Sequence, residues 1–98
     1  MNVSTSQSED RLEPPSDIVG RRLGDSTVLI RLHTNRIYEL NATGARIWEL
    51  IVEGVPLRQV VATLQREFDV DAGTAAEAVD ELVVTLRREG LIEQPSHG

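Results

Sequence analysis

The sequence predicts an α+β fold in which a three-stranded antiparallel sheet is followed by a three-helix bundle. Between residues 18 and 41, short apolar runs alternate with turn residues, and Val28, Ile30 and Leu32 follow the period of two that is typical of a half-buried strand. After Asn41 the apolar residues instead recur at spacings of three and four, which is the period of an amphipathic helix. This change of period at residue 41 divides the domain into a sheet half and a helical half.

The strand region contains three apolar runs separated by two short turns. The expected strands are Ile18–Val19, Thr27–Leu32 and Arg36–Leu40, and the turns are Gly24-Asp25-Ser26 and His33-Thr34-Asn35. Turns this short indicate an antiparallel meander, with the third strand at the edge of the sheet. In that strand Tyr38 and Leu40 share one face, and we expect Ile37 on the opposite face, together with Leu29.

The helical region carries a start and a stop signal for each of three helices. Asn41 or Thr43 can cap the first helix and Gly54 ends it. Pro56 suits the first turn of the second helix, and Asp71 and Gly90 bound the third. The apolar stripe of the second helix is Leu57, Val60, Val61, Leu64 and Phe68, and that of the third is Ala75, Val79, Leu82 and Leu86. The only Trp in the chain, Trp48, lies on the stripe of the first helix with Ala45 and Ile51, which predicts that it packs in the core.

Composition predicts a single domain with short tails. Residues 1–16 are rich in Ser, Gln, Glu and Pro and contain few large aliphatic side chains, so we expect a disordered N-terminal tail there. The domain itself is assigned to residues 17–94, and residues 95–98 form a second disordered tail. The N-terminal stretch has no basic start and no apolar centre, so it does not resemble a signal peptide, and a cytoplasmic location is expected.

Charge argues against nucleic acid and membrane as partners. The chain has a formal net charge of -6, and such a protein is repelled by phosphate backbones and by anionic membrane surfaces. A helical trio beside a small sheet is winged-helix-like, but residues 71–89, which would have to enter a DNA groove, carry five acidic residues against two Arg. We therefore expect neither nucleic acid nor membrane as a partner.

The sequence shows no set of residues that would catalyse a reaction or bind a metal. It has no Cys, and its two histidines, His33 and His97, lie in a predicted turn and in the C-terminal tail without a partner at metal spacing. Glu67, Asp69 and Asp71 alternate like calcium ligands but lack the Gly and the distal Glu of a calcium loop, so they are expected to be a polar helix connection. We expect no enzyme activity and no cofactor.

The string Leu-Asn-Ala-Thr-Gly-Ala-Arg-Ile-Trp at residues 40–48, supported by Gly90-Leu91-Ile92, resembles the PqqD-like family. The resemblance runs from about Val19 to Glu93. It implies a recognition element for ribosomally made, post-translationally modified peptides (a RiPP recognition element), without catalysis of its own. In such proteins the leader segment of a precursor peptide is added as an antiparallel strand to the third strand, in a groove whose wall is the third helix.

The resemblance assigns the docking edge to the third strand and one groove wall to the third helix. The expected peptide-binding residues of the strand are Arg36, Ile37, Tyr38, Glu39 and Leu40. Those of the helix form a second stripe beside the core stripe, namely Ala76, Asp80, Val83, Val84 and Arg87. In this interpretation Val83 and Val84 line the groove, and Asp80 and Arg87 meet polar leader side chains. The alternative for the last two is a solvated flank with ordinary helix ion pairs, such as Asp80 with Arg87 or Arg88.

The resemblance also indicates a pathway and its partners. The stretch from His33 to Tyr38 replaces the Pro-Glu-Gly-like segment of members that act in pyrroloquinoline quinone (PQQ) formation, and the chain looks more like the stand-alone recognition proteins of lasso peptide biosynthesis. The implied partners are a precursor leader peptide, a separate leader peptidase and a cyclase. The alternatives are a chaperone for PQQ-type or radical-enzyme peptide maturation, and a structural or regulatory protein-interaction module.

Overall fold

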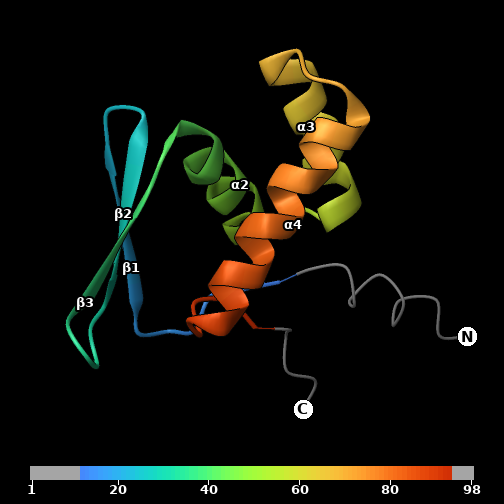
Figure 1. Ribbon diagram of the computed structural model, residues 1–98. Coiled ribbons are helices and arrows are strands. Elements are labelled where there is room, and N and C mark those ends of the chain that lie inside the picture. Colours follow the sequence, from blue (N-terminus) through green and yellow to red (C-terminus); the bar gives the residue numbers. More distant parts are fainter. Residues whose placement is uncertain (1–11, 94–98) are drawn as a thin grey trace, which may run out of the picture.

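A computed structural model of the protein describes residues 12–93, and Figure 1 shows the order of its elements. Three strands come first and three helices follow, which confirms the predicted α+β fold. The strands are β1 (Ile18–Leu23), β2 (Ser26–Arg31) and β3 (Arg36–Leu40), and the helices are α2 (Ala42–Val52), α3 (Leu57–Phe68) and α4 (Ala72–Arg88).

The strands form one antiparallel sheet in the order β1-β2-β3, so β3 lies at an edge as predicted. β1 and β2 are joined by the two-residue turn Gly24-Asp25, where Gly24 has φ 63, and the strand pairing closes with Leu23 opposite Ser26. β1 is longer than its apolar run because Arg21 and Arg22 continue the ladder to this turn. Arg21 and Arg22 are exposed at the edge of the sheet and can therefore be polar. For this reason the apolar pattern of the sequence predicts only the first part of β1.

Local signals in the sequence fix the helix ends. The side chain of Asn41 accepts a hydrogen bond from the Gly44 N–H and caps α2, and Asp71 caps α4 by accepting one from the Thr74 N–H. At the other end of α4 the chain turns through Gly90 at φ 72, and the Leu91 N–H donates to the Leu86 carbonyl over 2.8 Å. This is a Schellman motif, which satisfies carbonyls of the last turn and returns Leu91 to the core.

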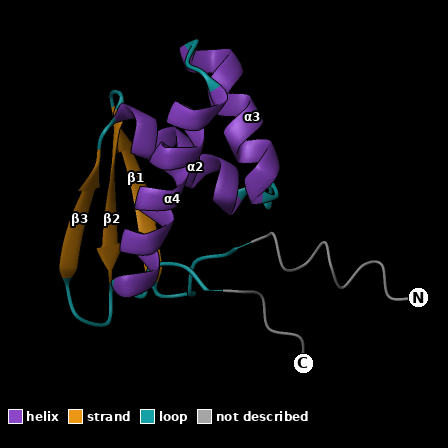
Figure 2. Cartoon of the chain, turned by 45° about the vertical axis from the view of Figure 1, so that its right-hand side comes forward, coloured by secondary structure: helices purple, strands orange, loops and turns teal. Residues whose placement is uncertain are grey.

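The sheet and the helices form two layers, with all the helices on one side of the sheet (Figure 2). α2 packs on β2 and β3, whereas α3 and α4 pack chiefly on each other and on α2. The largest fully buried side chains are Leu29, Ile47, Ile51, Val60, Leu64, Leu86 and Leu91. Trp48 is also buried, at 6% exposure, which confirms its assignment to the core.

The ordered domain begins earlier than predicted. Leu12 is only 2% exposed and belongs to the core, and Glu13 pairs with Glu93 through two main-chain hydrogen bonds of 2.9 and 2.8 Å. The prediction of disorder is therefore wrong for residues 12–16, because main-chain pairing with the segment after α4 holds a single leucine in the core. The rest of the two predicted tails, residues 1–11 and 94–98 with His97, lies outside the described residues.

Candidate functional site

Within residues 12–93, the free edge of β3 presents unpaired main-chain groups at two residues. The Leu32 N–H donates to the Asp17 carbonyl over 2.9 Å, and Leu23 and Ser26 close the other end of the same ladder. The main-chain groups of successive residues in an antiparallel strand point to alternate sides. In β2, the N–H and C=O groups of Val28 and Ile30 therefore point to β1, and those of the odd-numbered residues point to β3. The partners of those odd-numbered residues are Arg36, Tyr38 and Leu40. The N–H and C=O groups of Ile37 and Glu39 consequently point away from the sheet.

The side chains of β3 divide between the two faces of the sheet in a way that corrects one prediction. Tyr38 lies opposite Leu29, which is fully buried, so these two residues share the face covered by the helices. Ile37 instead lies opposite Ile30 and is 67% exposed on the outer face. Ile37 therefore does not share a face with Leu29. The face predicted for Ile37 was wrong because the register between β2 and β3 decides which residues share a face, and this register cannot be read from the position of a residue in its own strand.

Two contacts join the start of β3 to the end of α4. The Tyr38 hydroxyl donates to Glu89 Oε1 over 3.3 Å, and Arg36 Nη2 lies 3.9 Å from the same oxygen. The Arg36 guanidinium also lies 5.6 Å from the centre of the Tyr38 ring. Since both side chains come from the edge strand, the C-terminal end of α4 lies beside the start of β3.

A hollow of about 420 Å³ lies beyond the other end of β3. We call it the β3 groove. Its lining residues are Asn41, Thr43, Gly44 and Ile47 from the start of α2, and Ala78, Glu81, Leu82 and Thr85 from α4. The lining therefore combines apolar side chains, such as Ile47 and Leu82, with polar ones, such as Asn41 and Glu81. A peptide added to β3 would have this groove at one end and Glu89 at the other.

The structure places the predicted α4 residues on a different flank of the helix. Successive residues turn by about 100° around a helix, so Ala78, Leu82 and Thr85 share one side, and Asp80 and Val84 lie on the opposite one. The predicted residues that do not line the β3 groove are Ala76, Asp80, Val83, Val84 and Arg87. Val83 is 8% exposed and belongs to the core, whereas Val84 is 54% exposed.

The reason for this difference is that the sequence shows two flanks beside the core stripe of α4. The predicted flank was the more apolar one, because of Val83 and Val84. The flank beside β3 is polar, with Glu81, Thr85 and Glu89, and its one large apolar residue, Leu82, had been assigned to the core. The helix cap at Asn41 is the one sequence signal for the position of the groove. It places the start of α2 directly after the end of β3, and the groove forms between this start and α4.

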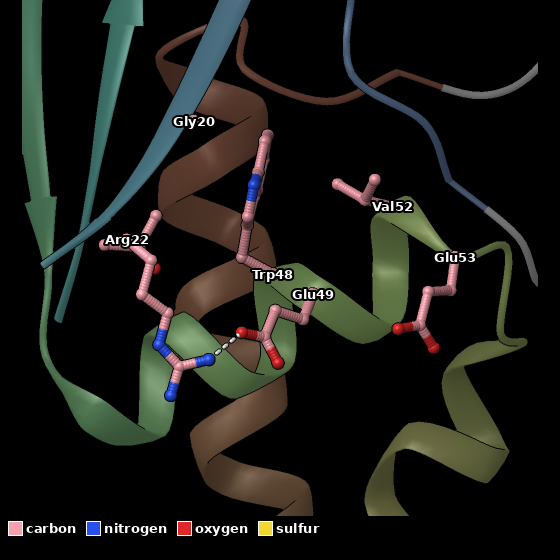
Figure 3. A pocket seen from close by; sticks show the side chains of 7 residues that line it. Gly20, Arg22, Trp48, Glu49, Val52 and Glu53 are labelled. Atoms are coloured by element: carbon pink, nitrogen blue, oxygen red, sulfur yellow. Dashed lines mark hydrogen bonds and ion pairs between the residues drawn. The ribbon is translucent and has the colours of Figure 1, made fainter. Parts of the chain in front are cut away.

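A second hollow, of about 250 Å³, lies beside the opposite edge of the sheet, between β1 and α2 (Figure 3). We call it the β1 hollow. Its lining residues are Gly20, Arg22, Thr27, Trp48, Glu49, Val52 and Glu53. Arg22 forms an ion pair with Glu49, which bridges the two elements. Both edges of the sheet are thus accompanied by a helix and a hollow.

An ion-pair chain fixes α2, the helix shared by both hollows. The Arg46 guanidinium binds Glu67 of α3 through hydrogen bonds of 2.8 and 3.0 Å, and it binds Glu49 at 3.0 Å. The hydrogen bonds from Arg46 lower the pKa of the Glu67 carboxyl, and those same carboxylates raise the pKa of Arg46. The hydrogen bond from the Thr74 N–H likewise lowers the pKa of Asp71.

Residues 12–93 contain no cluster of three or more potential metal ligands. Within the same range, every helix is too short or too polar to span a bilayer.

Comparisons with known proteins agree with the architecture. The sequence profile of the PqqD family, described as coenzyme PQQ synthesis protein D, matches residues 26–92, which is more than half of the chain. A structure described as TbiB1 in complex with the TbiA(beta) leader peptide is 27% identical in sequence, with a TM-score of 0.79, and the match covers 87% of this chain and 99% of that one. A structure of a lasso peptide synthetase B1 complexed with the leader peptide is 22% identical, with a TM-score of 0.78, and the match covers 85% and 98%. No curated protein matches the chain significantly.

Proposed function

Since the chain belongs to the PqqD family, we propose that it binds the leader segment of a ribosomally made precursor peptide by strand addition to β3. The carrying observation is the outward direction of the main-chain groups of Ile37 and Glu39 on an edge strand whose start lies beside the C-terminal end of α4. An extended peptide there gains backbone hydrogen bonds, and its alternate side chains reach the groove. The similar structure that is 27% identical is described as a complex with a leader peptide, which supports a leader peptide as the ligand.

The residues proposed to contact the leader follow from the placement described above. On β3 they are Arg36, Ile37, Tyr38, Glu39 and Leu40, with Ile37 and Glu39 supplying the main-chain bonds. On α4 we replace the predicted stripe by the residues that line the β3 groove or reach β3, namely Ala78, Glu81, Leu82, Thr85 and Glu89. A leader residue opposite Tyr38 points toward the helices, and its neighbours opposite Ile37 and Glu39 point toward the outer face.

The proposed role is non-catalytic, cytoplasmic presentation of the precursor. Binding the leader holds the rest of the precursor close to a processing enzyme on the same protein, which raises the effective concentration to about the mM range for a short flexible link. The enzymes proposed to use this arrangement are a leader peptidase and a cyclase of lasso peptide biosynthesis. The family description supports a second candidate, a chaperone for a PQQ-type precursor.

The test is titration of a fluorescently labelled leader peptide, encoded by the precursor gene beside this one, followed by anisotropy. We expect saturable binding by the wild-type protein. The scrambled leader is the matched control, because it has the same composition and net charge. A precursor gene accompanied by genes for a peptidase and an asparagine-synthetase-like cyclase supports the lasso assignment, and one beside a radical enzyme supports the second candidate. Equal binding of native and scrambled leaders would reject sequence-specific recognition.

A further inference from the structure

The sheet has a second free edge, at β1, whose main-chain groups also point outward. Val19 and Arg21 bond to β2 in the same ladder as Asp17 and Leu23, so the main-chain groups of the alternate residues of β1 face away from the sheet. The Ile18 N–H is already used, because it donates to the Pro15 carbonyl over 3.3 Å, which leaves the N–H and C=O groups of Gly20 and Arg22 open. Within residues 12–93, β1 pairs with no other strand than β2. A second extended segment therefore has main-chain partners at this edge.

Trp48 marks the base of the β1 hollow beside this edge (Figure 3). Its indole nitrogen lies 3.3 Å from the position that a Cβ on Gly20 would occupy, so the glycine leaves the nitrogen uncovered. No hydrogen bond reaches this nitrogen from the described residues, yet none of their fully enclosed side-chain nitrogen or oxygen atoms lacks a partner. The indole N–H must consequently be accessible through the hollow. Val52 forms the opposite rim and is 52% exposed.

The size of the β1 hollow suits one side chain better than a cofactor. Its volume of about 250 Å³ is below the roughly 300–1,000 Å³ of sites for drug-sized ligands. An unpaired donor at the base of a mainly apolar hollow, next to outward main-chain groups, is the arrangement that strand addition uses: backbone bonds for affinity and a pocket for alternate side chains.

We propose that the β1 edge is a second strand-addition site, occupied by an extended segment of the leader peptidase. This inference rests on the proposed function, in which a leader peptidase acts on the leader that this chain holds. The leader occupies β3, and β1 is the opposite edge of the same sheet, two strand spacings or about 10 Å away. Both edges can hence be occupied at once, and the peptidase is held beside the leader that it cleaves.

Charge defines the segment that fits. Glu53 lies on the rim of the β1 hollow, and Arg21 lies on the outer face opposite Val28; neither forms an ion pair within residues 12–93. A bound strand alternates between these two faces. The segment should carry an aliphatic or aromatic residue for the hollow, a basic residue near it for Glu53, and an acidic residue on the other face for Arg21. A second copy of the chain fits less well, because each copy carries a net charge of -6.

Two variants test this site without touching β3. Val52→Arg places a bulky charge at the rim, and its matched control is Val84→Arg, since Val84 is 54% exposed on the far flank of α4. Gly20→Pro removes an outward N–H that no strand bond uses. Its control is Gly20→Ala, which adds a Cβ at the same place beside the Trp48 nitrogen but keeps that N–H, so a difference between the two variants reports the N–H. Circular dichroism and thermal melts establish that each variant folds. Anisotropy with the labelled leader then measures the β3 edge separately from the β1 edge.

The readout is ¹⁹F NMR of protein labelled with 5-fluorotryptophan, which gives one signal because the chain has one Trp. The probe is the purified, unlabelled leader peptidase encoded beside this gene. We expect it to shift the signal, and we expect Val52→Arg and Gly20→Pro to weaken peptidase binding roughly tenfold or more while leader binding stays unchanged. The Val84→Arg variant should bind the peptidase with the same affinity as wild type.

Other results have distinct meanings. Peptidase binding that both β1 variants retain, or leader binding by wild type without any peptidase binding, would overturn the inference and leave the proposed function intact. A signal that shifts with protein concentration in the absence of peptidase would identify a second copy as the occupant, and would also overturn it. Absence of leader binding by wild type would reject the proposed function itself.

Discussion

Replacing Glu39 by proline removes one outward main-chain donor from the β3 edge. The free protein loses no ladder bond, because the paired residues of β3 are its neighbours Tyr38 and Leu40. In the complex, the leader carbonyl that faces Glu39 is left without its donor. Such a loss costs about 1–3 kcal/mol when the acceptor is desolvated. At about 1.4 kcal/mol per tenfold, the leader should bind roughly 5- to 150-fold more weakly.

The assay is the leader titration by anisotropy, together with thermal melts of each variant. Glu39→Ala is the matched control, since it removes the same side chain and keeps the N–H, and we expect its affinity to stay within about threefold of wild type because exposed charges contribute little. Tyr38→Pro provides the opposite case, because it deletes a donor that bonds to Leu29 and should destabilise the sheet. Equal affinities of folded Glu39→Pro and Glu39→Ala would refute strand addition at this residue.

Three further predictions concern the groove wall and the supports of the fold. Leu82→Ala should weaken leader binding about tenfold, whereas Val84→Ala should leave it unchanged; equal losses in the titration would contradict the assignment of the α4 flank. Gly90→Ala should destabilise the protein by about 1–2 kcal/mol in urea unfolding, because φ is 72 there and the new Cβ would lie 3.0 Å from a guanidinium nitrogen; unchanged stability would contradict that strain. Because Arg46 lowers the pKa of Glu67, the unfolded state binds protons more readily, so this stabilisation is present above the ordinary pKa of 4.5 and is lost as pH falls below it. Glu67→Gln should therefore unfold at a lower urea concentration than wild type at pH 7, and the two midpoints should approach each other at pH 3. A difference that persists at pH 3 would count against a stabilising role of the Arg46–Glu67 pair.

The sequence was sufficient for the elements whose ends are set by local chemistry. Asn41, Asp71 and Gly90 act within one or two helical turns, so their side-chain acceptors and positive φ could be recognised without knowing the tertiary structure. The edge position of β3 followed from turns too short for any other connection. These predictions needed no contact between residues distant in the chain.

The features that the sequence did not reveal all depend on such distant contacts. Leu12 is in the core because Glu13 pairs with Glu93, eighty residues away in the chain, and nothing near Leu12 indicates it. The groove flank of α4 depends on how the helix is rotated against β3, which apolar periodicity leaves undetermined when two flanks border the core stripe. Val83 illustrates the ambiguity, since an apolar residue beside the stripe can belong to the core or to a binding surface.

Amide hydrogen exchange, followed by NMR with and without saturating leader peptide, tests strand addition most directly. We expect the amides of Ile37 and Glu39 to exchange rapidly in the free protein and to become protected at least about tenfold in the complex, because each gains a main-chain acceptor. Tyr38 and Leu40 should be protected in both states, and Gly20, on the other edge, should not respond to the leader. Saturable leader binding that leaves the exchange of Ile37 and Glu39 unchanged would show that the leader does not add to β3 as a strand.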